Sequence, residues 1–261
     1  MNRVSRRGFT LVELLVVIGI IGILATFAVI QLTGSREKAR VAKGVAFSAQ
    51  LLRTTADELI GRWDFDECNG SSALDSSGNG NTGVFAGTLT WSTEAPSKQG
   101  CSLIFNGTDS RVSAPIPSLG SVQTKSLWFY ASSEVTANRY LFDEGGNNHF
   151  IRIISGKVTN GTNVSSYFNS VTTIVPGRWY FVVSVYDGSK LYTYIDGSLD
   201  RTDVAVAQVP GATLSIGNYS GGGPYYFAGN IDDVRVFNRA LSGREIHQMY
   251  VESAPRYVAE R

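Results

Sequence analysis

Oxygen-bearing side chains recur at every second position of the segment "DSSGNGNTG", residues 75–83. The side chains that supply them are those of Asp75, Ser77, Asn79 and Asn81. Carboxylate and amide oxygens are calcium ligands, and Gly80 allows a sharp turn, but no glutamate follows at the twelfth position, so the segment is not an EF-hand loop. Two interpretations stay open, a structural calcium site and a turn held by hydrogen bonds.

Groups for acid–base or nucleophilic catalysis are sparse in the chain. His149 and His247 are its only histidines, and neither lies in a cluster with metal-ligand spacing or in a nucleophile–histidine–acid set. Asp64 and Asp66 in "WDFDE", with Glu67 beside them, are the nearest approach to a catalytic carboxylate pair. Because the aspartates alternate with aromatic residues, the solvated face of a strand also explains them. We therefore predict that the protein is not an enzyme.

Tyr219, Tyr225 and Tyr226 lie in the glycine-rich segment "NYSGGGPYYFAG". Sugar binding needs exposed aromatic faces with polar groups nearby, and loops of this kind often carry binding residues. Tyrosines that merely pack against a turn are the alternative. The segment is thus a candidate site for a glycan or a surface protein ligand.

Cys68 and Cys101 are the only two cysteines, and both follow the apolar N-terminal segment. An even pair in an oxidising compartment indicates a disulfide. Closing a loop of about 33 residues would stabilise the fold by roughly 3–4 kcal/mol in the chain-entropy model. Two free thiols are the alternative.

The N-terminal segment combines basic and apolar residues. No charged residue interrupts residues 14–30, and with the apolar residues just before them they are long enough to span a bilayer as a helix of about 20 residues. Three arginines precede this run, and by the positive-inside rule they place the N-terminus in the cytoplasm. We predict a single-pass segment of the inner (cytoplasmic) membrane over about residues 9–30.

The segment "RGFTLVE", residues 7–13, resembles the signal of type IV pilin-like proteins, the prepilins and pseudopilins. The resemblance implies that a prepilin peptidase/methyltransferase cleaves between Gly8 and Phe9 and methylates Phe9, while the apolar helix stays attached. It also implies homo- or hetero-oligomeric pilin-like subunits as partners, in an extracellular filament or a periplasmic pseudopilus. Glu13, a costly residue inside a bilayer, would pair with the N-terminus of Phe9 on a neighbouring subunit.

Helical spacing continues beyond the apolar run, with a break at residues 34–35. We therefore expect a long spine helix over residues 9–59, after a leader of residues 1–8. From there the sequence changes to short β-branched and aromatic runs bounded by Gly, Asn, Asp or Pro. These runs predict a mainly β head, an antiparallel sandwich over residues 60–250, and then a C-terminal tail of residues 251–261.

The order of the strand-like runs resembles a laminin-G-like, concanavalin A-like jelly roll. The runs that carry the resemblance are "GRWDFDE", "CSLIFNG", "GRWYFVVSVYDGSKLYTYIDGSL" and "GNIDDVRVFNRALSGREI". The third run predicts a hairpin that turns at residues 187–190. A structural calcium ties the first strand region to the last in related jelly rolls, which implies Asp232 and Asp66 as partners of Asp75 and Asn79.

Asp232 in "IDDVRVF" is expected on the same strand face as Val234 and Val236, the core side, where a carboxylate needs a partner. Glucanases of this fold carry a Glu-x-Asp-x-Glu strand with two catalytic acids. The sequence contains no such strand. The fold also hosts lectins, adhesion modules and spacers, so it does not by itself assign a function.

Composition limits the classes of partner. A formal net charge of +1 gives no strong field for nucleic acid. We expect a structural subunit of a surface filament or secretion pseudopilus. The alternative is a minor pilin or adhesin whose head binds carbohydrate or protein, which an exposed aromatic surface on the head would favour.

Overall fold

The computed structural model describes residues 58–254, apart from 97–99, 118, 121, 133–134, 146–148, 164–165 and 206–210, together with Leu11, Leu15, Val16, Ile18 and Ile20. The chain divides into two compact units, Met1–Arg53 and Thr54–Arg261. In the first unit the five described residues are helical, and their apolar side chains are exposed. The processing junction, Glu13 and most of the expected spine helix lie outside the described residues. Among the residues that are described, none belongs to a helix with the length and apolar character needed to cross a bilayer.

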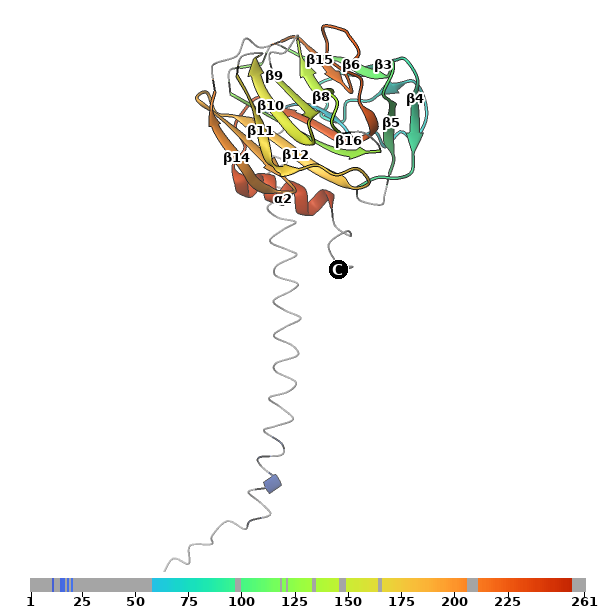
Figure 1. The fold of residues 1–261 in the computed structure, drawn as a ribbon. Coiled ribbons are helices and arrows are strands. Elements are labelled where there is room, and N and C mark those ends of the chain that lie inside the picture. Colours follow the sequence, from blue (N-terminus) through green and yellow to red (C-terminus); the bar gives the residue numbers. More distant parts are fainter. Residues whose placement is uncertain are drawn as a thin grey trace, which may run out of the picture. The chain divides into compact units, whose positions relative to one another are not determined.

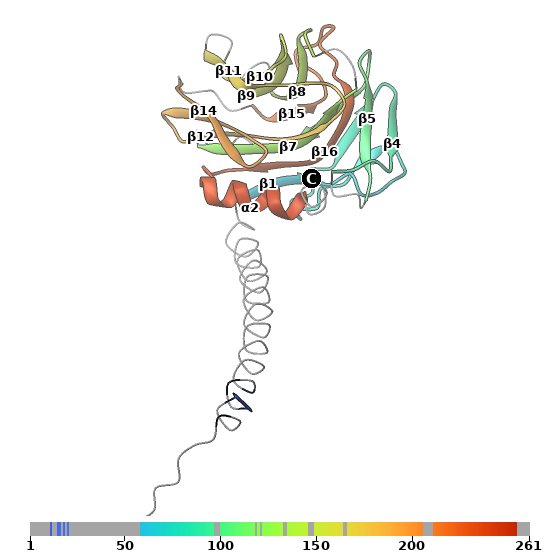
Figure 2. The same ribbon diagram turned by 60° about the horizontal axis from the view of Figure 1, so that its bottom comes forward.

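The second unit contains an antiparallel sandwich of two sheets, which Figures 1 and 2 show as two layers. Within the described residues each sheet has eight strands, and we call them sheet 1 and sheet 2. The strands of sheet 1 are, in order, β14 (Ser198–Val204), β13 (Lys190–Ile195), β12 (Trp179–Tyr186), β7 (Gln123–Ala131), β16 (Ala228–Phe237), β5 (Ser102–Asn106) and β4 (Leu89–Ser92), with β1 (Leu59–Trp63) paired to β16. Those of sheet 2 are β11 (Ser166–Thr173), β10 (Lys157–Asn163), β9 (His149–Ile154), β8 (Arg139–Glu144), β15 (Thr213–Ile216), β6 (Arg111–Pro115), β3 (Gly83–Ala86) and β2 (Ser72–Ala73). The prediction of a mainly β antiparallel sandwich is confirmed.

Two local predictions have different outcomes. The hairpin between β12 and β13 turns at residues 187–190 as predicted, with the Asp187 amide donating to the Lys190 carbonyl at 3.1 Å. Strand β1 begins at Leu59, so the last residue of the range expected for the spine helix is a strand residue. Leu59 pairs with Phe237 of β16, and this pairing fixes the entry of the chain into sheet 1.

The core lies between the sheets because alternate residues of each strand face inward. On β7, Leu127 and Phe129 are fully buried in the main apolar cluster, whereas Trp128 between them packs on the opposite face. Ile151 and Ile153 of β9 face the same core. The apolar residues that recur at every second position of the sequence are therefore those that face the core, and the residues between them face outward.

One end of the space between the sheets is polar. Lys125 of β7 and Glu144 of β8 form an ion pair, and neither side chain is exposed to solvent. Burial lowers the pKa of Lys125 to about 8, against the opposing effect of Glu144, so the ammonium group is still charged at neutral pH. On the neighbouring strands, His149 is hydrogen-bonded to the Ser184 hydroxyl, which donates to the Asn160 side chain at 2.8 Å.

A C-terminal helix, α2 (Gly243–Ser253), covers the outer face of sheet 1 (Figure 2). It begins with a capping box, in which the Ser242 hydroxyl accepts from the Glu245 amide and the Glu245 carboxylate accepts from the Ser242 amide. Ile246 and Met249 are buried against aromatic residues of β7 and β12. We predicted strands alone up to residue 250 and a tail beyond it, so this helix is a correction.

Strands β11 and β14 are edge strands of different sheets, and their side chains meet. Asp200 of β14 accepts hydrogen bonds from the backbone amides of Val171 at 2.7 Å and Thr172 at 2.9 Å on β11. Arg201 of β14 donates to the Asn169 carbonyl at 3.2 Å. Side chains of one edge thus satisfy backbone groups of the other.

Candidate functional site

Aromatic side chains and one arginine gather on the outer face of sheet 2. On β9, Phe150 and Arg152 alternate with the core residues Ile151 and Ile153, and so they face outward. Tyr140 of β8 is the register partner of Arg152. We call the whole set the tyrosine–arginine patch, and its members are Tyr140, Phe150, Arg152, Tyr167, Tyr219 and Tyr225.

The aromatic part of the patch has two layers. Tyr140 and Phe150 are buried, with ring centroids 5.7 Å apart. Tyr219 and Tyr225 are partly exposed, and their rings lie 5.3 Å and 5.8 Å from the Tyr140 ring. The two outer rings are 6.0 Å apart in an edge-to-face arrangement. All these separations are typical of favourable aromatic pairs, so a fixed base supports the exposed tyrosines.

The glycine-rich loop that carries Tyr219 and Tyr225 is anchored to sheet 2. The Tyr140 amide donates to the Tyr225 carbonyl at 3.0 Å. The Ser220 amide donates to the Asp143 carboxylate at 2.9 Å, and the Ser220 hydroxyl bonds the same oxygen. Because these contacts position the loop before any ligand arrives, less ordering entropy is lost on binding.

Arg152 lies among three rings of the patch. Its guanidinium carbon is 4.9 Å from the Phe150 ring centroid, 5.2 Å from that of Tyr167 and 5.6 Å from that of Tyr140. One guanidinium N–H donates to the Tyr140 hydroxyl at 3.3 Å. The buried Nε atom has no hydrogen-bond partner among the described residues. Burial, opposed by the Arg152 charge, raises the pKa of Tyr140, which therefore stays a neutral hydroxyl at physiological pH.

Gly161 of β10 makes the close approach of these rings possible. Its register partners are Phe150 on β9 and Tyr167 on β11. A methyl group at this position would overlap the Phe150 ring and lie 2.9 Å from the Tyr167 Cβ atom. A larger residue would therefore push the two rings apart.

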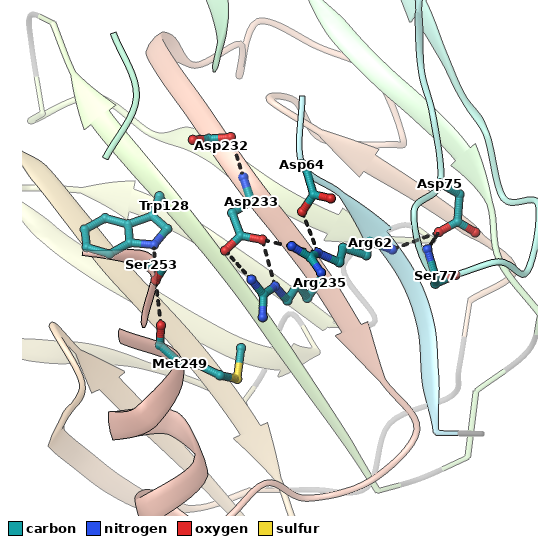
Figure 3. A network of polar contacts seen from close by, with 10 residues as sticks. All are labelled: Arg62, Asp64, Asp75, Ser77, Trp128, Asp232, Asp233, Arg235, Met249 and Ser253. Atoms are coloured by element: carbon teal, nitrogen blue, oxygen red, sulfur yellow. Dashed lines mark hydrogen bonds and ion pairs between the residues drawn. The ribbon is translucent and has the colours of Figure 1, made fainter. Parts of the chain in front are cut away.

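Asp75, the first predicted calcium ligand, organises its loop as a hydrogen-bond acceptor. Its carboxylate accepts from the backbone amides of Arg62 at 3.0 Å and Ser77 at 2.9 Å (Figure 3). It also accepts from the backbone amide of Asn81 at 2.9 Å. Burial would raise the pKa of Asp75, but the hydrogen bonds from Ser77, Arg62 and Asn81 together lower it. These contacts are those of the hydrogen-bonded turn that the sequence left open as an alternative.

Other predicted calcium ligands have hydrogen-bond partners of their own. The Asn79 side-chain amide donates to the Leu59 carbonyl at 2.7 Å. Asp66 accepts from the Cys101 amide at 3.1 Å. In the described part of the chain, no three His, Cys, Asp or Glu side chains are grouped in a way that could hold a metal ion. Calcium binding by these residues stays a prediction.

Asp232 does not share a face with Val234, contrary to our expectation. It pairs with Trp128, whose side chain packs on the outer face of sheet 1, whereas Val234 is in the main core. Asp233 has a φ of 44°, in the left-handed region, and the pairing register shifts at this point. The bulge adds one residue to the strand and reverses the side-chain alternation. Burial and the neighbouring Asp233 charge raise the pKa of Asp232 well above its usual value.

Asp64 belongs to an ion-pair network rather than to a catalytic carboxylate pair. Its carboxylate is 2.5 Å from Arg62 Nε, which also lies 3.9 Å from the Asp233 carboxylate (Figure 3). Asp233 in turn receives two hydrogen bonds of 2.7 Å from Arg235. The network joins β1 to the bulge of β16, and so its role is to hold these strands together.

Cys68 and Cys101 form a disulfide, with Cα atoms 5.4 Å apart. This separation is typical of disulfides. The bond joins the segment after β1 to the residue before β5, and the prediction from the sequence is confirmed.

His149 and His247 do not share a site. His149 is buried between the sheets, and His247 is exposed on α2. Tyr226 pairs with Tyr140 through the backbone. None of the aromatic ring contacts in the described residues involves Tyr226, so it is not a member of the tyrosine–arginine patch.

A family model for the concanavalin A-like lectin/glucanases superfamily matches residues 106–247, more than half of the 261 residues. The chain belongs to this superfamily. A model for the prokaryotic N-terminal methylation motif matches residues 3–29. The two matches confirm the fusion that the sequence resembles, a prepilin-type N-terminus joined to a concanavalin A-like domain. They indicate a structural or binding protein that is anchored in a membrane at the cell surface or in a pseudopilus.

Several solved structures have the same sandwich fold as this chain. Domain 4 of AbnA, a GH43 extracellular arabinanase from Geobacillus stearothermophilus, was solved with arabinotriose; it is 21% identical, with a TM-score of 0.62, over 74% of this chain and 98% of that one. A structure of botulinum neurotoxin type C is 15% identical, with a TM-score of 0.60, over 77% and 52% of the two chains. The binding domain of Paraclostridial Mosquitocidal Protein 1 is 12% identical, with a TM-score of 0.62, over 76% and 53%. The chain therefore spans about half the length of these two toxin structures, and identities this low show the fold alone.

Sequence reasoning found two members of the patch, Tyr219 and Tyr225, and missed the others. The missed residues are Tyr140, Phe150, Arg152 and Tyr167. They come from three strands, and only the register of sheet 2 brings them together. One signal was available in "HFIRIIS", where a phenylalanine and an arginine alternate with core isoleucines, a combination that a plain solvated face does not require.

Proposed function

We propose that the chain is a type IV pilin-like subunit, anchored in the cytoplasmic membrane and then incorporated into a surface filament or a secretion pseudopilus. The methylation motif at residues 3–29 supports this assignment. Prepilin peptidase/methyltransferase would cleave between Gly8 and Phe9 and methylate Phe9. Glu13 would then pair with the new N-terminus of a neighbouring subunit, since a charge pair in an apolar environment can fix the register of packed helices.

The mass of the N-terminal peptide tests this assignment, compared between filaments sheared from cells and the membrane fraction. A peptide beginning at methylated Phe9 in the sheared fraction is the result expected for a filament subunit. The same peptide confined to membranes would support a pseudopilin. Intact Met1 or Asn2 in both fractions would reject processing and leave a simple membrane-anchored sandwich.

We further propose that the head binds carbohydrate through the tyrosine–arginine patch. The observation that carries this proposal is the pair of partly exposed rings, Tyr219 and Tyr225, held over buried Tyr140 beside the Arg152 guanidinium. Ligand sites typically combine aromatic surface with a few fixed polar groups. The AbnA domain was solved with arabinotriose, and the neurotoxin C study names two ganglioside molecules. These likenesses agree with a saccharide ligand but do not assign one, because a fold hosts many functions.

Saccharide binding by the full-length chain, in a detergent without a sugar headgroup, tests the second proposal. Tyr219→Ala and Tyr225→Ala should each weaken binding at least about tenfold, the scale expected when a well-packed aromatic contact is truncated. Tyr226→Ala is the matched control, because it removes a tyrosine of the same loop that lies outside the patch. Full binding by the Tyr219 and Tyr225 variants would reject the patch as the site.

A further inference from the structure

We propose that the tyrosine–arginine patch selects saccharides that carry a carboxylate group, and that Arg152 is the residue that recognises this group. The inference rests on the proposed carbohydrate binding and adds the chemical class of the ligand. Three aromatic rings surround the Arg152 guanidinium, whereas the described residues give it few hydrogen-bond acceptors.

The described residues use little of the hydrogen-bonding capacity of Arg152. A guanidinium has five N–H donors in a planar fork. The described residues provide one hydrogen bond to it, from an N–H to the Tyr140 hydroxyl, and the buried Nε has no partner. A buried donor without an acceptor is uncommon in a native structure and points to a missing partner.

The charge of Arg152 is also uncompensated by the described residues. Five other arginines form ion pairs with aspartate or glutamate, and these are Arg62, Arg178, Arg201, Arg235 and Arg239. None of the ion pairs formed by the described residues involves Arg152. The carboxylate of Asp143, on the neighbouring strand, is occupied with the amide and hydroxyl of Ser220. An anionic group of a ligand would therefore supply a counter-charge, and acceptors for guanidinium N–H groups that the described residues leave unbonded.

The rings around Arg152 hold it ready for such a group. Cation–π contacts with Phe150, Tyr167 and Tyr140 fix the plane of the guanidinium. A planar, pre-oriented fork matches a carboxylate through two parallel hydrogen bonds, and a lysine ammonium cannot reproduce this geometry. Pre-orientation also means that little side-chain entropy is lost when the anion binds.

The position of Arg152 explains why the anion should belong to a saccharide. The Tyr140 ring contacts the Arg152 guanidinium and also the Tyr219 and Tyr225 rings, so it links the charged group to the two outer tyrosines. A sugar ring lying on the outer tyrosines would thus place a carboxylate substituent, as in a uronic or sialic acid, toward the arginine. Charge complementarity and an aromatic surface meet at one place on sheet 2.

Two pairs of probes that differ in one charged group test the proposal on the full-length chain. The pairs are sialyllactose with lactose, and oligogalacturonate with its methyl ester. The acidic member should bind at least about tenfold more tightly than the neutral one, the scale of a charge-assisted bidentate contact. Arg152→Gln should remove this difference, and Arg152→Lys should restore only part of it. Arg178→Gln is the matched control, because it removes an exposed arginine that also lies over a tyrosine ring but is paired with Asp196.

The outcomes separate this inference from the proposed function. Equal binding of acidic and neutral probes, unchanged in Arg152→Gln but lost in Tyr219→Ala, would overturn the role of Arg152 and leave carbohydrate binding intact. Equally tight binding of a sulfated oligosaccharide would overturn the preference for a planar carboxylate. Failure of every probe to bind would overturn both proposals. If Arg152→Gln melts below the assay temperature, the wild-type protein still tests the preference for a carboxylate, because equal binding of the two members of each probe pair would reject it.

Discussion

The indole N–H of Trp128 donates a hydrogen bond of 3.0 Å to the hydroxyl of Ser253, which joins the middle of β7 to the last turn of α2. The Ser253 hydroxyl in turn donates to the Met249 carbonyl at 2.6 Å. Trp128 also stacks on Tyr250, with ring centroids 5.7 Å apart. The helix is thus part of the folded head, because it completes a second apolar cluster on the outer face of sheet 1.

Removal of α2 should therefore destabilise the head strongly. A chain that ends at Ser242 lacks the buried residues Ile246 and Met249 and exposes the Trp128 side chain. Each fully buried side chain of this size contributes about 1.5–3 kcal/mol to the free energy of unfolding. Thermal unfolding followed by tryptophan fluorescence should show a large fall in Tm. Ser253→Ala should lose only about 0.5–1.5 kcal/mol. Gln248→Ala, which removes a side chain that bonds Glu252 on the helix surface, is the control and should leave Tm nearly unchanged.

Reduction of the Cys68–Cys101 disulfide should lower the free energy of unfolding by about 3–4 kcal/mol, because the bond closes a loop of roughly 33 residues in the unfolded chain. Urea unfolding with and without a thiol reductant measures this loss. The double variant Cys68→Ser/Cys101→Ser should match the reduced protein and should not respond to the reductant. A reductant effect that persists in the double variant would mean that the loss has another cause.

The buried Lys125–Glu144 pair should show strong coupling in a double-mutant cycle. Lys125→Met leaves a buried carboxylate without its cation and should cost about 3–5 kcal/mol. In the wild type the Gly211 amide donates to the Glu144 carboxylate at 3.0 Å. The double variant Lys125→Met/Glu144→Gln removes both charges and keeps a side-chain oxygen that can accept this hydrogen bond. The double variant should therefore be more stable than Lys125→Met alone. Urea unfolding of the four proteins gives the coupling energy, and simple additivity would show that the charges do not interact.

Stability should depend on pH through Asp187 in the β12–β13 turn. Burial alone would raise the pKa of this carboxylate, but hydrogen bonds from the Lys190 and Ser189 amides and the Tyr192 and Ser189 hydroxyls lower it to about 2. In the unfolded chain the pKa of an aspartate is about 3.9. The charged form is therefore favoured in the folded state, and its contribution is present above about pH 4 and is lost as the pH falls toward 2.

Melting curves of Asp187→Asn between pH 6 and pH 2 measure this contribution. The Tm difference from the wild type should be largest at the upper end of the range and should shrink toward pH 2. Tyr192→Phe, which removes one of the hydrogen bonds to the carboxylate, should give a weaker form of the same pH dependence. A constant difference over the whole range would assign the effect to hydrogen-bond geometry instead of charge.

Much of the sandwich could be predicted because local patterns determine it. The alternation in "WYFVVSVYDGSKLYTYIDG" indicates two half-buried strands, and Asp187-Gly188 marks the turn between them. The Cys68–Cys101 bond was predictable because the chain has two cysteines and both follow the apolar segment, on the side where an oxidising compartment is expected. Helix α2 carries a Ser242–Glu245 capping signal, but we expected the sandwich to extend to residue 250.

Other features depend on contacts that the linear sequence does not contain. The bulge at Asp233 places Asp232 on the opposite face from the one that strict alternation gives. Arg152 meets Tyr140 through strand pairing and Tyr225 joins them through an anchored loop, and neither relation follows from spacing along the chain. Site prediction therefore failed where residues far apart in the sequence converge.

The contact of Asp200 with β11 has a consequence for copies of the head that come close together. Edge strands with free amides can recruit a strand from another molecule and start aggregation. Here two amides of β11, those of Val171 and Thr172, are already occupied by a side chain of the same head. Each head thus blocks part of its own edge to intermolecular strand exchange, so that crowding many copies need not lead to amyloid-like association between them.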